Sequence, residues 1–139
     1  MLTDLRRSRS EYTAADGERF FDAVHNARVI TNAERYYRIM YYGSAESWNL
    51  RDQHMFETLV ELMRARGPDA KAVVWAHNSH IGDACHTEMS ARGELNLGQL
   101  CRDQFGSITY LIGFGTDSGT VADAGDWDGP VPIKEVRPG

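Results

Sequence analysis

Apolar side chains recur at every third or fourth position between about Gly17 and Gly43. The positions that form this stripe are Phe20, Ala23, Ala27, Ile30, Ala33, Tyr37 and Met40. This spacing places them along one face of a helix, which Gly43 is suited to end. Residues 1–15 show no clear period and are expected to form a flexible or partial N-terminus, before a single domain over residues 16–139.

A second helix is predicted to end at Gly67-Pro68, with Met55, Leu59 and Leu62 on its apolar face. Residues 44–49 are interpreted as a connection in which Ser47 or Asn49 caps the helix. A short loop between two helices favours an antiparallel pair packed on whatever sheet follows.

A short apolar run over residues 72–76 predicts a buried strand. It breaks at once into the polar stretch His77-Asn78-Ser79-His80-Ile81-Gly82-Asp83. Because open α/β sheets bind ligands just beyond the carboxyl ends of their strands, this stretch is the first place to look for a site.

The rest of the chain predicts shorter elements. Residues 86–93 are interpreted as a surface loop, and Asn96 is expected to cap a third helix that Gly106 closes. Strands are predicted over residues 107–114 and 120–122, the second paired with the first, before a loop-like end in which Trp127 is a candidate anchor.

This order of elements predicts an α/β fold in which helices pack on a small, largely parallel sheet. Two or three strands are fewer than the ~5 of a typical sheet. The sequence therefore predicts a partial domain of a larger α/β hydrolase-type fold.

Length and charge narrow the class of protein further. The 139 residues suit one domain, and a net charge of −5 argues against a nucleic-acid surface. No apolar run approaches the ~20 residues of a membrane span, and there is no signal-peptide core, so a cytoplasmic protein is expected. Cys85 and Cys101 are expected to be reduced thiols.

His77 and His80 are the first candidates for chemistry, because a neutral imidazole can accept a proton from water near pH 7. The structural alternative is that one ring donates to a loop carbonyl and the other faces solvent. A metal alternative also stays open, since Asp83, Cys85 or His86 could complete a ligand set with the two histidines.

Arg51, Asp52 and His54 form a second polar group in the second helix. Arg51 is suited to bind a carboxylate or an oxyanion. Asp52 is equally explained by the preference of acids for helix amino ends, and His54 by a surface position. Phosphate-loop and Gly-x-Ser-x-Gly signatures are absent from the sequence, which disfavours nucleotide binding and a serine triad.

Three blocks of the sequence resemble the erythromycin esterase family. They are Trp75-Ala76-His77-Asn78-Ser79-His80-Ile81-Gly82-Asp83, Ser47-Trp48-Asn49-Leu50-Arg51-Asp52-Gln53-His54-Met55, and Ile112-Gly113-Phe114 followed by Gly119-Thr120-Val121. The order and rough spacing of the blocks match, and the resemblance runs from about Asp22 to Pro132. The Ala-His-Asn-x-His block is the specific part.

The resemblance implies a metal-independent hydrolase, without a cofactor, that cleaves carboxylic esters such as the macrolactone of macrolide antibiotics. The family's active-site histidine falls on His77, with His80 as its companion, and its Arg-Asp pair falls on Arg51 and Asp52. Accordingly His77 is expected to orient water or stabilise the oxyanion and Arg51 to supply positive charge. Asp52 and His80 are expected to hold the others in place.

Further contacts and partners follow from the same resemblance. Trp48, Asn78 and Asp83 are predicted to contact the small-molecule ester substrate. Family enzymes are about three times longer, and their proposed general-base histidine lies in an amino-terminal half without a counterpart here. A truncated enzyme is therefore expected, which self-associates or pairs with an amino-terminal segment. Two alternatives remain, a non-catalytic binding module and a metal-dependent hydrolase using His77 and His80.

Overall fold

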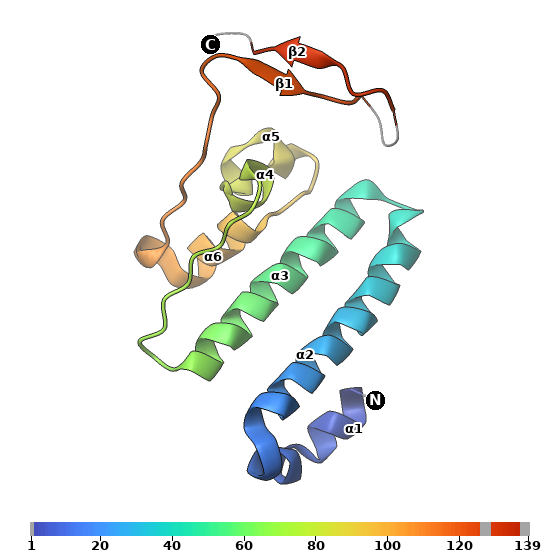
Figure 1. Cartoon of the computed structure of the whole chain (residues 1–139), viewed down its shortest axis with the longest axis vertical. Coiled ribbons are helices and arrows are strands. Elements are labelled where there is room, and N and C mark those ends of the chain that lie inside the picture. Colours follow the sequence, from blue (N-terminus) through green and yellow to red (C-terminus); the bar gives the residue numbers. More distant parts are fainter. Residues whose placement is uncertain (1, 126–128, 137–139) are drawn as a thin grey trace.

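The structure is a computed structural model that describes residues 2–125 and 129–136, so Trp127 lies outside the described residues. The described chain is mostly helical (Figure 1). Its elements are α1 (Leu2–Arg7), α2 (Arg9–Met40), α3 (Ser44–Arg66), α4 (Asn78–Ile81), η1 (Ala84–His86), α5 (Glu88–Ala91), α6 (Leu97–Phe105), η2 (Gly106–Ile108), β1 (Thr120–Ala122) and β2 (Ile133–Glu135). None of the described helices is both long and apolar enough to cross a membrane.

The long helices α2 and α3 lie side by side as an antiparallel pair, as predicted (Figure 1). Asp16 has non-helical angles inside α2, and its carboxyl group accepts a hydrogen bond from the Arg19 amide at 3.1 Å. The helix predicted from Gly17 is therefore the part of α2 after this kink, and helix also precedes it. By contrast, the predicted connection over residues 44–49 is wrong, because α3 already begins at Ser44.

The contact between α2 and α3 includes several polar pairs. Arg28, which is buried, forms ion pairs with Glu57 at 2.9 Å and with Glu61. Asn32 lies 2.7 Å from Nδ1 of His54. Burial lowers the pKa of His54, and the positive charge of Arg28 lowers it further. His54 therefore belongs to the contact between α2 and α3 and does not occupy the surface position expected from the sequence.

In the second half of the chain α4 and η1 pack on α6, and α5 packs on η1. Asn96 caps α6 as predicted, accepting from the Gln99 amide at 3.0 Å, and Gly106 ends it at φ 58°. α4 crosses α6 so closely that a Cβ on Gly98 would lie 2.1 Å from the Gly82 carbonyl oxygen. The predicted surface loop over residues 86–93 holds part of η1 and the short helix α5.

The only sheet within the described residues is the antiparallel pair β1–β2, which pairs Val121 with Lys134. The strand predicted over residues 120–122 is confirmed, but its partner is β2. A largely parallel sheet is not formed there: the segments 72–76 and 109–114 are extended, and neither forms a hydrogen-bonded ladder with another described strand.

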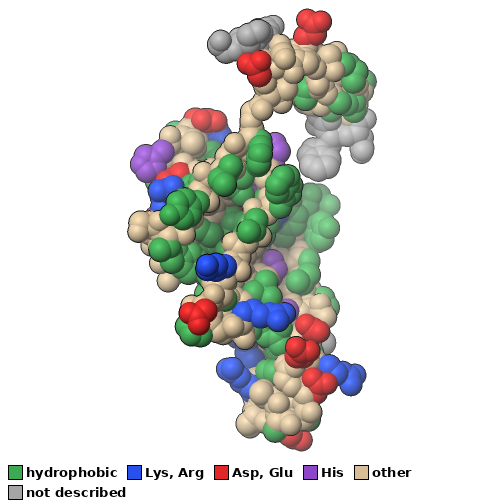
Figure 2. Space-filling model, turned by 60° about the vertical axis from the view of Figure 1, so that its left-hand side comes forward, with side chains coloured by type: hydrophobic (Ala, Val, Ile, Leu, Met, Phe, Trp, Pro, Cys, Tyr) green, Lys and Arg blue, Asp and Glu red, His purple; other side chains and the backbone are tan. Residues whose placement is uncertain are grey.

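These two segments run in the same direction (Figure 1). The Trp75 and Phe114 rings lie 5.6 Å apart. Without strands beside them their apolar side chains face outward: Val73 is 93% exposed, and Trp75 and Tyr110 are each 85% exposed. Figure 2 shows apolar side chains gathered on this side of the molecule.

Candidate active site

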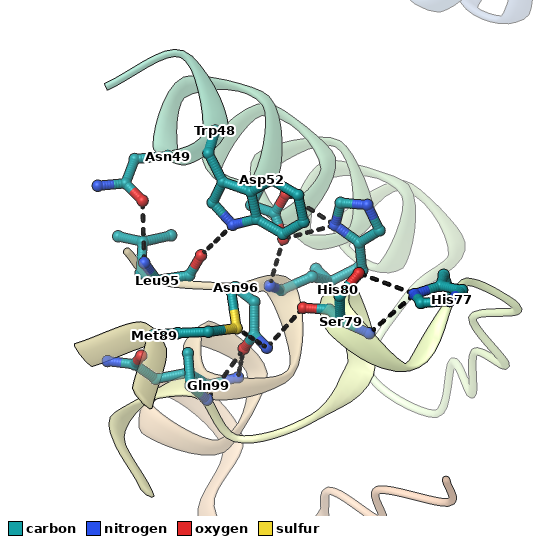
Figure 3. A network of polar contacts seen from close by, with 12 residues as sticks. Trp48, Asn49, Asp52, His77, Ser79, His80, Met89, Leu95, Asn96 and Gln99 are labelled. Carbon is teal, nitrogen blue, oxygen red and sulfur yellow. Dashed lines mark hydrogen bonds and ion pairs between the residues drawn. The ribbon is translucent and has the colours of Figure 1, made fainter. Parts of the chain in front are cut away.

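Side chains from the first turns of α3 bind the backbone of residues 93–97 (Figure 3). The Trp48 indole donates to the Leu95 carbonyl at 2.7 Å. Asn49 accepts from the Leu95 amide at 2.9 Å and donates to the Gly93 carbonyl at 2.8 Å. Because Trp48 and Asn49 lie within one turn of Asp52, a single face of α3 fixes the approach to α6.

Asp52 is the centre of this arrangement and is 0% exposed. Its carboxyl group accepts from Nδ1 of His80, with oxygen distances of 2.9 and 3.0 Å. It also accepts from the Leu97 amide, at 3.0 Å, in the first turn of α6, where unpaired amides favour an acid. Since Nδ1 of His80 is the donor, Nε2 of that ring is left to accept a proton.

The Trp48 ring also fixes the plane of His80. The two rings stack with centroids 4.6 Å apart and an angle of 4° between them. The guanidinium carbon of Arg51 lies 4.8 Å from the centroid of the Trp48 ring, a cation–π distance. The buried Nε of Arg51 makes no hydrogen bond within the described structure. Arg51, Trp48 and His80 therefore form one packed group.

His77 has a different hydrogen-bond pattern. It is exposed and caps α4, with Nδ1 accepting from the Ser79 amide at 3.2 Å. The Ser79 hydroxyl lies 2.9 Å from the same nitrogen. Because Nδ1 is the acceptor, Nε2 of His77 carries the ring proton and is a donor. The two histidines thus offer opposite groups: an acceptor on His80 and a donor on His77.

Asn96 holds α4 and α6 together beneath these histidines and is 1% exposed. Besides capping α6, it donates to the Ser79 carbonyl at 2.9 Å and accepts from the Ala84 amide at 3.3 Å. Sequence reasoning identified the cap but not the other two bonds, because a capping signal is local and these partners are 12 to 17 residues away.

Asn78 and Asp83 lie in other contacts. Both polar atoms of the Asn78 side chain bind the backbone of Phe114, with the Phe114 amide donating at 3.1 Å. Asp83 lies 3.1 Å from His86 and 3.4 Å from Arg102. The structure therefore brings together Trp48, Arg51, Asp52 and His80, with His77 on the same short turn, whereas Asp83 belongs to a separate group.

The predicted ligand set of the metal alternative is not assembled here. Among the described residues, the group of three or more possible ligands contains Asp83, Cys85 and His86, without His77 or His80.

A buried carboxyl group that accepts from Nδ1 of a histidine fixes the tautomer of that ring, as the aspartate of a catalytic triad does. Comparison of the sequence with models of protein families identifies one family. The chain belongs to the erythromycin esterase family, whose sequence model matches residues 1–139. No solved structure matches the chain. The family confirms the resemblance found in the sequence and indicates a hydrolase that acts on a small molecule.

Proposed function

We propose that this chain carries the histidine site of a hydrolase that cleaves carboxylic esters, macrolactones among them, by water that a histidine activates. One observation carries the proposal: the buried Asp52 accepts the Nδ1 proton of His80 at 2.9 Å and so leaves Nε2 as a base. Family membership supports the reaction class. Inactivation of macrolide antibiotics is the corresponding biological role.

In this mechanism Nε2 of His80 takes a proton from water as the water oxygen attacks the ester carbonyl. Asp52 stabilises the positive ring that results. The Nε2–H of His77 donates to the oxyanion that forms on the carbonyl oxygen. The C–O bond then breaks, and the proton on His80 passes to the departing alkoxide.

This division of roles differs from the one that the resemblance alone implied. There His77 was the leading histidine and His80 its companion. Their hydrogen bonds favour His80 as the base and keep His77 as the group that stabilises the oxyanion. Arg51 supplies positive charge beside the same ring system. Trp48 stays a prediction as a substrate contact, because its ring stacks on His80 and meets Arg51.

Asn78 and Asp83 remain predictions as substrate contacts. The Asn78 amide is engaged by the Phe114 backbone, and Asp83 by His86 and Arg102.

The test uses His80→Asn, because an asparagine amide can replace Nδ1 as a donor to Asp52 while removing Nε2. Purified protein is assayed with a macrolide and with a simple aryl ester, and far-UV circular dichroism verifies the fold. General-base catalysis contributes about 10²–10⁴-fold, so a loss of that size is expected. His25→Asn, at a histidine in the contact between α2 and α3, is the matched control. Equal rates in His80→Asn and the unaltered chain would favour a non-catalytic binding module.

The unpaired segments 72–76 and 109–114 add a proposal about partners. Their backbone groups lack ladder partners and their apolar side chains are exposed, which suits strands added at either edge. We propose that the occupant is the strand-bearing amino-terminal half of a family enzyme. Val73→Lys combined with Tyr110→Lys is expected to abolish the pairing, measured by sedimentation velocity of the mixed fragments.

Two results would contradict these proposals. Association of the chain with itself, equally strong without the added half, would show that a second copy is the occupant instead. Turnover that appears only with the added half, and that survives His80→Asn, would place the base outside this chain.

A further inference from the structure

Three side chains with metal-binding atoms meet on the short turn η1. The Cys85 sulfur lies 2.9 Å from an Asp83 carboxyl oxygen and 3.0 Å from Nδ1 of His86. The same His86 nitrogen lies 3.1 Å from the other Asp83 oxygen. All three possible ligand atoms fall within 4.8 Å of one another. None of these residues takes part in the Asp52–His80 contact.

We propose that Asp83, Cys85 and His86 bind a transition-metal ion of the Zn²⁺ class, at a site separate from the ester-hydrolysis site. A carboxylate oxygen, a thiolate and an imidazole nitrogen are the three donor types that Zn²⁺ takes in proteins. Three protein ligands leave a fourth tetrahedral position for water or a small ligand.

The spacing of the donor atoms fits this class of ion. With zinc bonds of about 2.0–2.3 Å, tetrahedral ligand atoms lie about 3.3–3.6 Å apart. The atoms of Asp83, Cys85 and His86 now lie 2.9–3.1 Å apart. Small side-chain rotations, which separate them by about 0.2–0.7 Å, would open the site for the ion.

The backbone of the turn is fixed although two of its side chains are exposed. Ala84 is fully buried, and its amide donates to Asn96 at 3.3 Å. The Ala84 carbonyl accepts from the Thr87 hydroxyl at 3.0 Å. Cys85 and His86 project into solvent from this anchored turn. The ligands are therefore pre-positioned and open to an ion from solution.

The groups around Asp83 affect metal binding in two ways, through the Cys85 thiol and through the charge of Arg102. The thiol of Cys85 donates to Asp83, which lowers the pKa of the carboxyl group and raises that of the thiol. On binding, the metal displaces the thiol proton to solvent and bonds to the sulfur. Arg102 lies 3.4 Å from Asp83 and competes with the ion for the same carboxylate.

Co²⁺ is the probe, because a cobalt–thiolate bond gives a charge-transfer absorption band. The reduced full chain is titrated with Co²⁺, and Zn²⁺ is then added in competition. One equivalent is expected to produce the band and Zn²⁺ to abolish it. Cys85→Ala should remove the band, whereas the matched control Cys101→Ala, at the buried second cysteine, should keep it.

Two further variants test the geometry. His86→Ala is expected to weaken Co²⁺ binding by about tenfold or more, since loss even of groups that orient ligands costs about 10–100-fold. Arg102→Gln is expected to strengthen binding severalfold by removing the competing cation. His80→Asn should leave the band unchanged, which separates this proposal from the esterase proposal. A missing band in the unaltered chain, or a band that persists in Cys85→Ala, would overturn the site.

Discussion

The buried carboxyl group of Asp52 accepts hydrogen bonds from the His80 ring and from the Leu97 amide. Two substitutions of Asp52 are expected to affect these two hydrogen bonds differently. Asp52→Ala leaves the His80 Nδ1–H and the Leu97 amide without an acceptor at a position that is 0% exposed. Each unsatisfied buried donor costs about 1–3 kcal/mol, so the free energy of unfolding should fall by about 2–6 kcal/mol.

Asp52→Asn should behave differently. Its amide oxygen can still accept from Leu97, while its NH₂ group faces His80. The His80 ring can restore a hydrogen bond only by moving its proton to Nε2, so that Nδ1 becomes the acceptor. We therefore expect a stability loss of only about 1–2 kcal/mol, together with loss of the catalytic base.

Two measurements separate these cases. Urea denaturation followed by circular dichroism gives the stabilities, with Asp69→Asn as a control at an exposed aspartate. The ¹⁵N chemical shifts of the His80 ring report its tautomer, which is expected to change from Nδ1–H to Nε2–H in Asp52→Asn. An unchanged tautomer, or an alanine variant no less stable than the control, would refute the assignment of Asp52 as the group that orients His80.

Three other substitutions test the packing. The lowered pKa of His54 means that its contribution to stability is fully present above its ordinary value of 6.5 and is lost as pH falls through and below it. His54→Gln should therefore flatten the pH dependence of urea unfolding in that range. Gly98→Ala should prevent stable folding, because its Cβ would lie 2.1 Å from the Gly82 carbonyl, whereas Gly115→Ala, with open space, should leave the thermal midpoint unchanged. Asn96→Ala removes a cap and two further buried bonds, and should lower the unfolding free energy in urea by about 2–4 kcal/mol.

Local signals located the main parts of α2, α3 and α6, but they missed the first turn of α3 and the short helices α1, α4 and α5, and they predicted the sheet poorly. The cap at Asn96 and the stop at Gly106 depend on neighbouring residues, so the pattern alone located them. Residues 72–76 and 109–114 have strand-like sequences and extended backbones, but a ladder also requires a neighbour at the correct distance. The apolar pattern predicts the extended conformation of each segment, but it does not show whether a neighbouring strand is present.

The sequence predicted which residues form the candidate site, but it did not predict the hydrogen bonds between them. His80 and Asp52 are 28 positions apart, and nothing in either local pattern shows that one binds the other. Asp52 was equally consistent with an acid in the first turns of a helix. Only the crossing of α3 over the start of α6 reveals that its partners are a ring nitrogen and a backbone amide.

The Asn78 side chain has a consequence for how a complete sheet would assemble. By offering both a donor and an acceptor to the Phe114 backbone, its amide imitates the peptide group of a neighbouring strand. The Asn78 side chain thereby fixes the register of segments 72–76 and 109–114 relative to each other, without a hydrogen-bonded ladder between them. A strand that pairs with these segments would meet two segments whose relative register is already fixed. A shift of the register by one residue would therefore be disfavoured.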